Sequence, residues 1–289
     1  REATDATTSA LEYDSGVLTA KQAVKKLSEQ MRTIAESGEL PGLSTGMDPI
    51  DTVTGGMRPG ELWVVAAETS GGKSVWLLQT AVSAIQMGKR VLIISLEMQA
   101  SLVVSRMACN LRAVPLGTFT HPRQAGARWL QVASDCLKGL AEAPLSIHDK
   151  GGVTFDQIAG IARCEAVRHG KLDLLIVDYL QLVDGSRRRR DETREQEMAG
   201  ISRGLKSLAK ALDCPVATAS QMNEQGKMRE SRAIGFDADV VLVIEEDGIR
   251  GAKVRNAERG QLFPLKLNGS LQRFERVYVA PQQTEFRTR

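Results

Sequence analysis

The sequence predicts an α/β fold: a mostly parallel sheet flanked by helices, with antiparallel C-terminal hairpins at the sheet edge and a short helix ahead of it. Two observations carry this prediction. From Glu61 onward, short runs that are apolar throughout alternate with segments of helical periodicity, which is typical of parallel strands buried between two layers of helices. After Gly248 the pattern changes to short strand-like runs separated by tight turns, which favours hairpins.

The segment ahead of the alternating pattern contains one amphipathic helix. Residues 1–18 lack periodicity, and we expect them to be flexible. Thr19 and Gln22 have the spacing of a capping box. Apolar residues then recur at helical spacing, at Val24, Leu27, Met31 and Ile34. We therefore predict a flexible segment at 1–18, a helix at 19–37 and a main domain at 38–289, and the apolar stripe can pack on that domain or on a neighbouring copy.

The main domain is predicted to contain five buried strands and five longer helices. The strands are "ELWVVAA", "RVLIISL", "DLLIVDYLQLV", "PVATAS" and "DVVLVIEE". The helices are expected at residues 73–87, 101–111, 128–140, 155–168 and 198–212. A tight turn is predicted in "LNGSL", around Asn268 and Gly269.

Composition excludes some classes of function but does not identify one. The 289 residues suit one large domain or a domain with an arm. The net charge of +3 neither demands nor excludes a nucleic-acid partner. The four cysteines lie too far apart for the paired spacing of zinc sites, so we expect reduced thiols and a cytoplasmic protein. No apolar run approaches the ~20 residues of a membrane span and there is no signal peptide, so no membrane partner is expected.

The loop after the first strand carries the clearest chemical signal. "AETSGGKS", Ala67 to Ser74, fits the phosphate-binding pattern G-x-x-x-x-G-K-S/T except at its first position. Small residues let successive backbone N–H groups curl around a phosphate, and the following helix adds its positive end. Lys73 is expected to reach the β- and γ-phosphates, and the Ser74 hydroxyl to bind magnesium. An ordinary glycine-rich turn is the alternative interpretation.

The predicted nucleotide-binding residues run from the end of the strand into the helix. They are Ala67, Glu68, Thr69, Ser70, Gly71, Gly72, Lys73, Ser74 and Val75. The alanine at the first position is a small departure, because a methyl group is tolerated where φ is negative. The pattern therefore predicts ATP or another nucleoside triphosphate, together with Mg²⁺, as ligands.

Two carboxylates are placed to complete such a site. Asp178 ends the "LLIVD" strand, at the edge where parallel sheets present groups to ligands. We interpret it as the Walker B aspartate, which holds magnesium through water; capping of a turn is the alternative. Glu97, in "IISLEM", ends the strand that follows the loop helix. It is the candidate base for the attacking water, or else a glutamate favoured at a helix start.

Six segments together resemble one family. They are "LSTGMDPIDTVTGGMRPGELWVVAAETSGGKS", "SLEM", "IVDYLQLV", "SQMN", "RESRAIGFDADVVLVI" and "KVRNAERG". In this order they resemble the C-terminal motor domain of DnaB-type replicative helicases, from about Leu40 to about Glu275. The resemblance implies a RecA-like fold, a hexameric ring around single-stranded DNA, and translocation driven by NTP hydrolysis. A helicase loader or a primase is a further partner to consider. The sequence begins at Arg1 rather than methionine, so we expect a fragment, without the collar domain of full-length relatives.

The resemblance also implies roles for single residues. Lys73 and Ser74 match the nucleotide loop, Glu97 the catalytic base and Asp178 the metal-associated carboxylate. Gln221 matches the glutamine that senses the γ-phosphate and couples it to DNA-contacting loops. The helix at 19–37 matches a linker that packs on the adjacent subunit.

Lys253 and Arg255 match the basic pair that reaches the nucleotide of the neighbouring subunit. They are two residues apart on an expected strand, so they face the same side. From a rim they would complete a neighbour's site as an arginine finger, which spreads positive charge over the transferring phosphoryl group. A solvated basic edge strand is the alternative.

The DNA-contacting residues are predicted on two segments. Arg229 and Glu230 match a family contact segment, and Arg232 stands where many relatives carry glycine. Four arginines, Arg187, Arg188, Arg189 and Arg190, follow the Asp178 strand and suit phosphate contact, although a solvated or inter-subunit role remains open. No aromatic residues are interleaved, so backbone tracking is favoured over base stacking.

The sequence thus predicts an ATP-dependent replicative helicase motor that translocates on single-stranded DNA and unwinds duplex. A RecA-like ATPase of recombination or repair is the first alternative, against which "SLEM" with "DYLQL" argues. A non-unwinding clamp on single-stranded DNA is the second, against which the intact Lys73, Glu97 and Asp178 argue.

Overall fold

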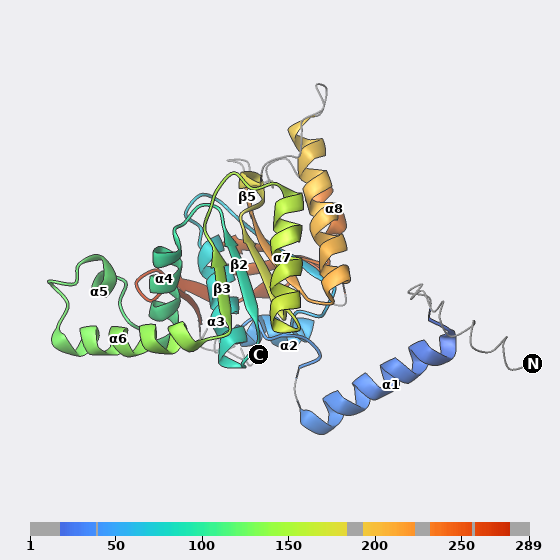
Figure 1. Ribbon diagram of the computed structural model, residues 1–289, viewed down its shortest axis with the longest axis horizontal. Helices are drawn as coiled ribbons and strands as arrows, with labels where there is room; N and C mark the ends of the chain where they lie inside the picture. Colours follow the sequence, from blue (N-terminus) through green and yellow to red (C-terminus); the bar gives the residue numbers. More distant parts are fainter. Residues whose placement is uncertain (1–17, 39, 184–192, 223–231, 256–257, 278–289) are drawn as a thin grey trace, which may run out of the picture. The chain divides into compact units, whose positions relative to one another are not determined.

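A computed structural model describes residues 18–38, 40–183, 193–222, 232–255 and 258–277. The chain divides into two compact units, residues 1–41 and 42–289. In the first unit, α1 spans Ala20–Ser37 and ends at Gly38, whose φ is left-handed (Figure 1). The predicted capping box is confirmed, because Thr19 Oγ1 accepts the Gln22 N–H at 3.3 Å and Gln22 Oε1 accepts the Thr19 N–H at 2.8 Å. The α1 side chains of Val24, Leu27 and Met31 are exposed.

The second unit is built on an eight-stranded sheet in the order β3-β2-β4-β5-β1-β6-β7-β8. The six strands from β3 to β6 are parallel, and β7 and β8 add antiparallel strands at one edge. The strands are β1 (Leu62–Ala67), β2 (Val91–Ser95), β3 (Leu145–His148), β4 (Leu174–Asp178), β5 (Val216–Gln221), β6 (Val240–Glu245), β7 (Gly248–Val254) and β8 (Leu262–Phe263). The predicted mostly parallel sheet is confirmed.

Helices cover both faces of this sheet. The longer ones are α3 (Lys73–Gln86), α4 (Ala100–Arg112), α6 (Ala127–Glu142), α7 (Phe155–His169) and α8 (Arg194–Leu212). Side chains alternate between faces along β1: Trp63 belongs to the hydrophobic cluster that includes residues of α3, α4 and α6, whereas Val64 belongs to the cluster that includes residues of α7 and α8. The central strands lie between α4 on one side and α7 and α8 on the other (Figure 1). None of the helices in the described ranges has the length and apolar character needed to cross a membrane.

Several elements differ from the sequence prediction. The strand predicted over "DLLIVDYLQLV" ends at Asp178, and a 3₁₀ helix at Leu180–Leu182 follows it. The chain stays apolar there because Leu180 is itself buried. Three short elements were not predicted: β3, α2 (Asp48–Thr54) and α5 (Gly117–Thr120). A further short helix, α9 (Arg232–Asp237), precedes β6.

The C-terminal hairpins occupy two places rather than one. β7 and β8 extend the sheet edge as predicted. However, β9 (Leu265–Asn268) and β10 (Arg273–Arg276) form a separate two-stranded sheet. The Gln79 side chain of α3 holds this hairpin, since its Oε1 accepts the Phe274 N–H at 2.7 Å and its Nε2 donates to the Phe274 carbonyl at 3.2 Å. The hairpin therefore packs over α3 and lies beside β7 at the sheet edge without pairing with it.

Candidate nucleotide-binding site

The loop between β1 and α3 has the geometry of a phosphate cradle. It leaves β1 at Ala67 and enters α3 at Lys73. Ser70 and Gly72 take left-handed φ values of 61° and 94°, which curl the backbone between strand and helix. Gly72 is the N-cap of α3, with no side-chain cap, so the free N–H groups of the first helical turn face the loop.

Close packing explains why this loop consists of small residues. A Cβ placed on Gly71 would lie 2.8 Å from the Cβ of Ala67, and a Cβ on Gly72 would lie 3.0 Å from Leu267 and Phe274 of the hairpin. Ala67 itself is fully buried as the last residue of β1, and its φ is not positive. The alanine at the first position of the pattern therefore causes no backbone strain.

Lys73 lies across the mouth of the loop. Its Nζ donates to the carbonyl oxygens of Ala67 at 3.1 Å and Glu68 at 2.7 Å. Burial lowers the pKa of Lys73, and the negative charges of Asp178 and Glu97 oppose that shift. The ammonium is thus held inside the loop by weak neutral acceptors, which a phosphate oxygen can replace with a charged one.

Asp178 and Glu97 are brought together by strand pairing. Ser95 of β2 pairs with Asp178 of β4, and the Leu96 N–H donates to the Asp178 carbonyl at 2.8 Å. Glu97, two residues past the pair, is exposed and lines the same cavity as Lys73. The predicted juxtaposition of the two carboxylates at the carboxyl edge of neighbouring strands is therefore present in the structure.

The carboxylate of Asp178 is buried and under-compensated. Neither of its oxygens has a hydrogen bond of normal geometry to a described residue. Burial raises its pKa to about 6; the nearby Ser74 hydroxyl lowers it, Glu97 raises it, and Lys73 lowers it. A buried anion without firm partners, beside a serine hydroxyl, suits Mg²⁺, which is held by one or two protein oxygens, phosphate oxygens and water.

Gln221 reaches the phosphate loop from the end of β5. Its Nε2 donates to Thr69 Oγ1 at 2.8 Å, although the two residues are 152 positions apart. Its backbone N–H also lies 3.5 Å from Gln181 Oε1, in the 3₁₀ helix after β4. Gln221 therefore connects the phosphate loop to the segments that follow β4 and β5.

Most of these groups line one cavity of about 530 Å³, and Asp178 is buried next to its lining residue Tyr179. Its lining contains Lys73, Ser74, Glu97 and Gln221. Among the lining residues that sequence reasoning missed are Arg106 of α4 and Gln272 of the hairpin. Arg106 Nε and Gln272 Oε1 are buried without a hydrogen-bond partner in the described part of the chain. Only the packing of α4 beside the sheet and the separate packing of the hairpin bring them here, and the local sequence carries no sign of either.

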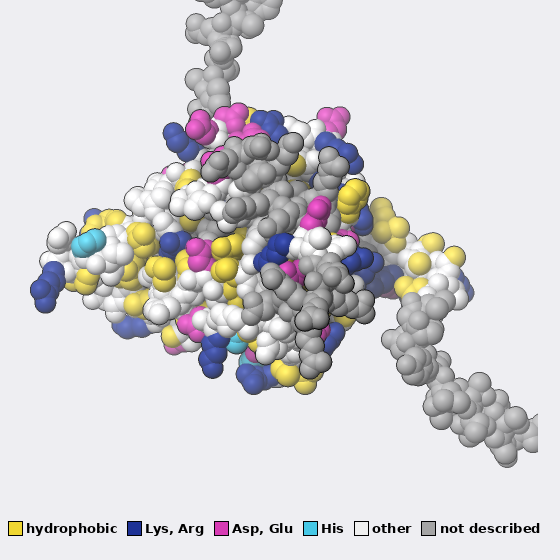
Figure 2. All heavy atoms as spheres, turned by 90° about the horizontal axis from the view of Figure 1, so that it is seen from above, with side chains coloured by type: hydrophobic (Ala, Val, Ile, Leu, Met, Phe, Trp, Pro, Cys, Tyr) yellow, Lys and Arg dark blue, Asp and Glu magenta, His cyan; other side chains and the backbone are white. Residues whose placement is uncertain are grey.

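The predicted DNA-contacting segments fall mostly outside the described residues. Arg187 to Arg190, Arg229 and Glu230 are not described. Arg232 begins α9, but its side chain is outside the description. On the face drawn in Figure 2, described Lys and Arg side chains are interspersed with Asp and Glu. The described surface in that view thus offers no single-sign basic patch, and the prediction of DNA contact rests on segments outside the described residues.

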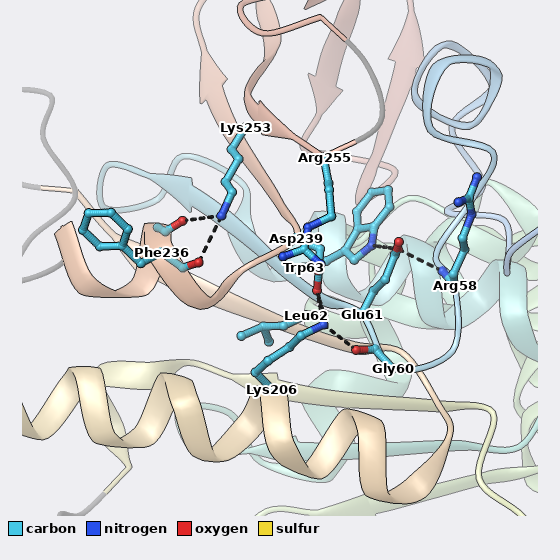
Figure 3. A network of polar contacts seen from close by, with 11 residues as sticks. Arg58, Gly60, Glu61, Leu62, Trp63, Lys206, Phe236, Asp239, Lys253 and Arg255 are labelled. Carbon is cyan, nitrogen blue, oxygen red and sulfur yellow. Dashed lines mark hydrogen bonds and ion pairs between the residues drawn. The ribbon is translucent and has the colours of Figure 1, made fainter. Parts of the chain in front are cut away.

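Lys253 and Arg255 lie near the amino ends of the parallel strands, whereas the phosphate loop lies at their carboxyl ends. β7 ends at Val254, so Arg255 is one residue beyond the predicted strand. Lys253 points toward the end of α9, whereas Arg255 points toward Asp239 in the segment that joins α9 to β6 (Figure 3). Lys253 Nζ donates to the carbonyls of Gly235 at 2.8 Å and Phe236 at 3.1 Å.

The position of Arg255 separates it from the phosphate loop of its own chain. Its NH1 lies 2.8 Å from Asp239 Oδ1, and Asp239 in turn accepts the N–H of Leu62, the first residue of β1. The loop leaves the other end of β1, which at about 3.3 Å per residue is roughly 17 Å away. Arg255 is therefore unable to reach the loop of its own chain without rebuilding this edge.

Comparison with known proteins agrees with this arrangement. The model of the DnaB-like helicase C terminal domain matches residues 42–276. The replicative DNA helicase DnaB of Haemophilus influenzae is 31% identical over 272 residues, covering 85% of this chain and 57% of that protein. The one from Geobacillus stearothermophilus is 33% identical over 228 residues, covering 73% and 48%. The chain thus spans about half the length of these relatives.

Solved structures give the same fold. One solved ATPase domain superposes with a TM-score of 0.81 at 21% identity, covering 90% of this chain and 99% of that one. A DnaB-like replicative helicase, solved in a study of its interactions with primase, gives a TM-score of 0.78 at 20% identity, covering 91% and 68%. The family model spans the loop, both carboxylates, Gln221 and the basic pair, and the chain belongs to the family of DnaB-like helicase C-terminal domains.

Proposed function

We propose that this chain is the ATP-hydrolysing motor of a replicative DNA helicase, working in a ring of identical subunits whose nucleotide sites are each completed by a neighbour. The proposal rests on one observation: the expected site residues are divided between the two ends of the parallel strands. Lys73, Ser74, Asp178 and Gln221 gather at one edge, and Arg255 lies at the other. A ring of six subunits is the assembly that the family resemblance implies, and head-to-tail contacts close into rings when the rotation permits.

The cavity residues divide the work of hydrolysis. Lys73 neutralises the β- and γ-phosphates, and the loop N–H groups bind their oxygens. Ser74 and Asp178 would hold Mg²⁺, which would supply positive charge beside the phosphate oxygens. Glu97 accepts the proton of a water as that water attacks the γ-phosphorus. The bond from this phosphorus to the β-γ bridging oxygen breaks, which releases ADP and inorganic phosphate.

Gln221 is the proposed link between nucleotide state and DNA. Its amide donates to Thr69 of the phosphate loop. A γ-phosphate arriving at the loop offers the same amide a charged acceptor. Gln221 lies two residues before the segment 223–231, which includes the predicted contact residues Arg229 and Glu230. Movement of Gln221 thus transmits the presence of the γ-phosphate to the segment that is predicted to contact single-stranded DNA.

The alternatives draw less support. The relatives reported above are replicative helicases rather than recombination or repair ATPases. A clamp that does not hydrolyse has no need of Glu97 beside the cavity. Primase interaction is described for one structural relative, and a loader or primase remains a proposed partner for this chain.

The proposal is tested by ATP turnover and strand separation. We expect single-stranded DNA to raise ATP turnover, and forked duplex DNA to be unwound in the presence of ATP and Mg²⁺. Lys73→Ala is the control, because it removes phosphate contact and leaves the opposite sheet edge intact. If DNA does not bind at low salt, where phosphate contacts are strongest, the helicase proposal is wrong. DNA binding without ATP turnover would instead favour the non-unwinding clamp.

A further inference from the structure

Asp239 is a buried acid at the edge opposite the phosphate loop, and it contacts several elements at once (Figure 3). Its side chain is 1% exposed. Its backbone N–H donates to the Leu62 carbonyl at 2.9 Å, and its own carbonyl accepts the Arg255 N–H at 3.2 Å. The residue is therefore fixed to β1 on one side and to the end of β7 on the other before its carboxylate makes any contact.

The two carboxylate oxygens of Asp239 have different partners. Oδ2 accepts the Leu62 N–H at 2.9 Å and the ammonium of Lys206, from α8, at 2.6 Å. Oδ1 pairs with Arg255 NH1 at 2.8 Å. Lys206 also donates to the Gly60 carbonyl at 2.7 Å. Lys206 thus balances the buried charge, and the second oxygen is directed at the arginine.

Among the described residues, one side-chain nitrogen of Arg255 has a partner, and most of its side chain is open to solvent. That side chain is 60% exposed, whereas the acid it contacts is almost inaccessible. A guanidinium carries five N–H donors in a rigid plane. A contact through NH1 therefore fixes the direction of the plane and leaves other donors accessible for a ligand outside the chain.

We infer that Asp239 is the positioning residue for Arg255 in the neighbouring subunit's nucleotide site. This inference rests on the proposed function. The anchored backbone, the Lys206 counter-charge and the Leu62 N–H hold the carboxylate rigid, and the carboxylate presets the guanidinium before a neighbour's triphosphate arrives. Preset donors cost no reorganisation during the reaction. Lys253, held by the α9 carbonyls, lies beside the pair and is not part of the anchor.

Subunit mixing tests the inference. Asp239→Asn is nearly isosteric and removes the charge that orients Arg255. We expect turnover of the homogeneous assembly to fall about 10²-fold, the loss associated with a displacement of about 1 Å. Mixing with Lys73→Ala subunits should restore part of it, because an intact Arg255 then faces the intact phosphate loop of the variant. A purely structural defect in Asp239→Asn would leave its own loop inactive, and mixing would restore nothing.

Two comparisons separate failure of this inference from failure of the proposed function. Arg255→Ala mixed with Lys73→Ala is the reference; if that mixture forms and shows no recovery, the shared site itself is wrong. If it recovers and the Asp239→Asn mixture does not, only the positioning role is wrong. Arg255→Ala should also mask Asp239→Asn, so the double variant should turn over no more slowly than Arg255→Ala alone. Additive losses would overturn the inference.

Controls address charge and folding. Asp237→Asn removes the same charge from the same segment, two residues from the contact, and should retain turnover. A loss equal to that of Asp239→Asn would overturn the specific role of Asp239. If Asp239→Asn alone is unfolded, the pair Asp239→Asn with Lys206→Met removes the stranded cation as well. That double variant should show the same recovery on mixing, and its failure to recover when folded would equally contradict the inference.

Discussion

The strand ends form two edges of the central sheet, and the buried carboxylates at these two edges have opposite surroundings. At the carboxyl edge, Asp178 is buried without a firm partner among the described residues, and its pKa rises to about 6. At the other edge, Asp239 is equally buried, yet its carboxylate is satisfied by Leu62, Lys206 and Arg255. One edge is thus incomplete until a cation arrives, and the other is complete and presents an exposed arginine. The difference indicates which edge binds a ligand and which edge supplies a group to the ligand of another subunit.

The largest expected effect is at the complete edge. Arg255→Ala should lower turnover in the assembly by ~10³–10⁵, the range for loss of an arginine finger. Nucleotide affinity of an isolated protomer should stay within about twofold, because Arg255 lies roughly 17 Å along β1 from its own loop. Turnover assays and titration with a fluorescent nucleotide measure the two quantities. A protomer that loses affinity together with turnover would show that the edges do not act separately.

The next effect is at the incomplete edge. Glu97→Gln keeps the size and hydrogen-bonding capacity of the side chain but removes its basicity. We expect turnover to fall by ~10²–10⁴, the range for general bases, while ATP still binds. Single-turnover hydrolysis and equilibrium binding distinguish the steps. Unchanged turnover would exclude Glu97 as the base, and Glu142→Gln, at the exposed end of α6, is a matched control.

Sequence periodicity predicted one edge far better than the other. Phosphate-loop residues are contiguous, Asp178 ends an apolar strand and Glu97 lies two residues past the end of another, so parallel pairing of these strands brings them together. The role of Asp239 was not predicted, because its partners Lys206 and Leu62 are 33 and 177 positions away. Arg106 and Gln272 were missed for the same reason. Pairing across long distances in the chain leaves no local pattern to detect.

The same limit explains the errors in the fold. A buried 3₁₀ turn and a buried strand are both apolar, so "DYLQLV" did not reveal that β4 ends at Asp178. β3 is only partly buried along its length, which removes the apolar run that marked the other strands. The β9–β10 hairpin was predicted from its turn, but its place over α3 depends on Gln79, 195 positions from Phe274.

A third test measures how much the buried ion pair of Lys206 contributes to the free energy of unfolding. Lys206→Met should destabilise the free protein by about 3 kcal/mol, at the lower end for a broken buried ion pair because Arg255 still contacts Asp239. Chemical denaturation measures the free energy of unfolding. Lys210→Met, one turn further along α8, is the control and should change it by less than about 0.5 kcal/mol. Equal losses would mean that the carboxylate of Asp239 does not depend on Lys206.

Asp178→Asn should act in the opposite direction on the free protein. The folded state raises the pKa of Asp178 from 3.8 to about 6, so folding favours the protonated form. That advantage is present below about pH 4 and is lost as pH rises through 6; above it, ionised Asp178 costs on the order of 3 kcal/mol. Asparagine removes this cost, so the variant should be more stable than the parent at pH 7.5.

The difference between the two proteins gives the pH dependence directly. Unfolding free energies are measured from pH 4 to 8 without nucleotide or Mg²⁺. The gap between variant and parent should be small near pH 4 and widen toward pH 7. With Mg²⁺ and nucleotide present it should shrink or reverse, because the bound cation favours the ionised carboxylate. A gap that does not vary with pH would mean that Asp178 is not the under-compensated charge at this edge.

The smallest effect tests the one departure from the phosphate-loop pattern. Ala67→Gly restores the usual first residue but removes a fully buried methyl group that packs beneath Gly71 and loosens the end of β1. We expect a loss of about 1 kcal/mol in unfolding free energy, with nucleotide affinity and turnover within about twofold of the parent, because φ at Ala67 is already negative. Ala66→Gly, one residue earlier in β1, is the matched control for loss of a methyl group. If Ala67→Gly alone raised nucleotide affinity tenfold, the alanine would be a constraint on the phosphate loop rather than part of the packing beneath it.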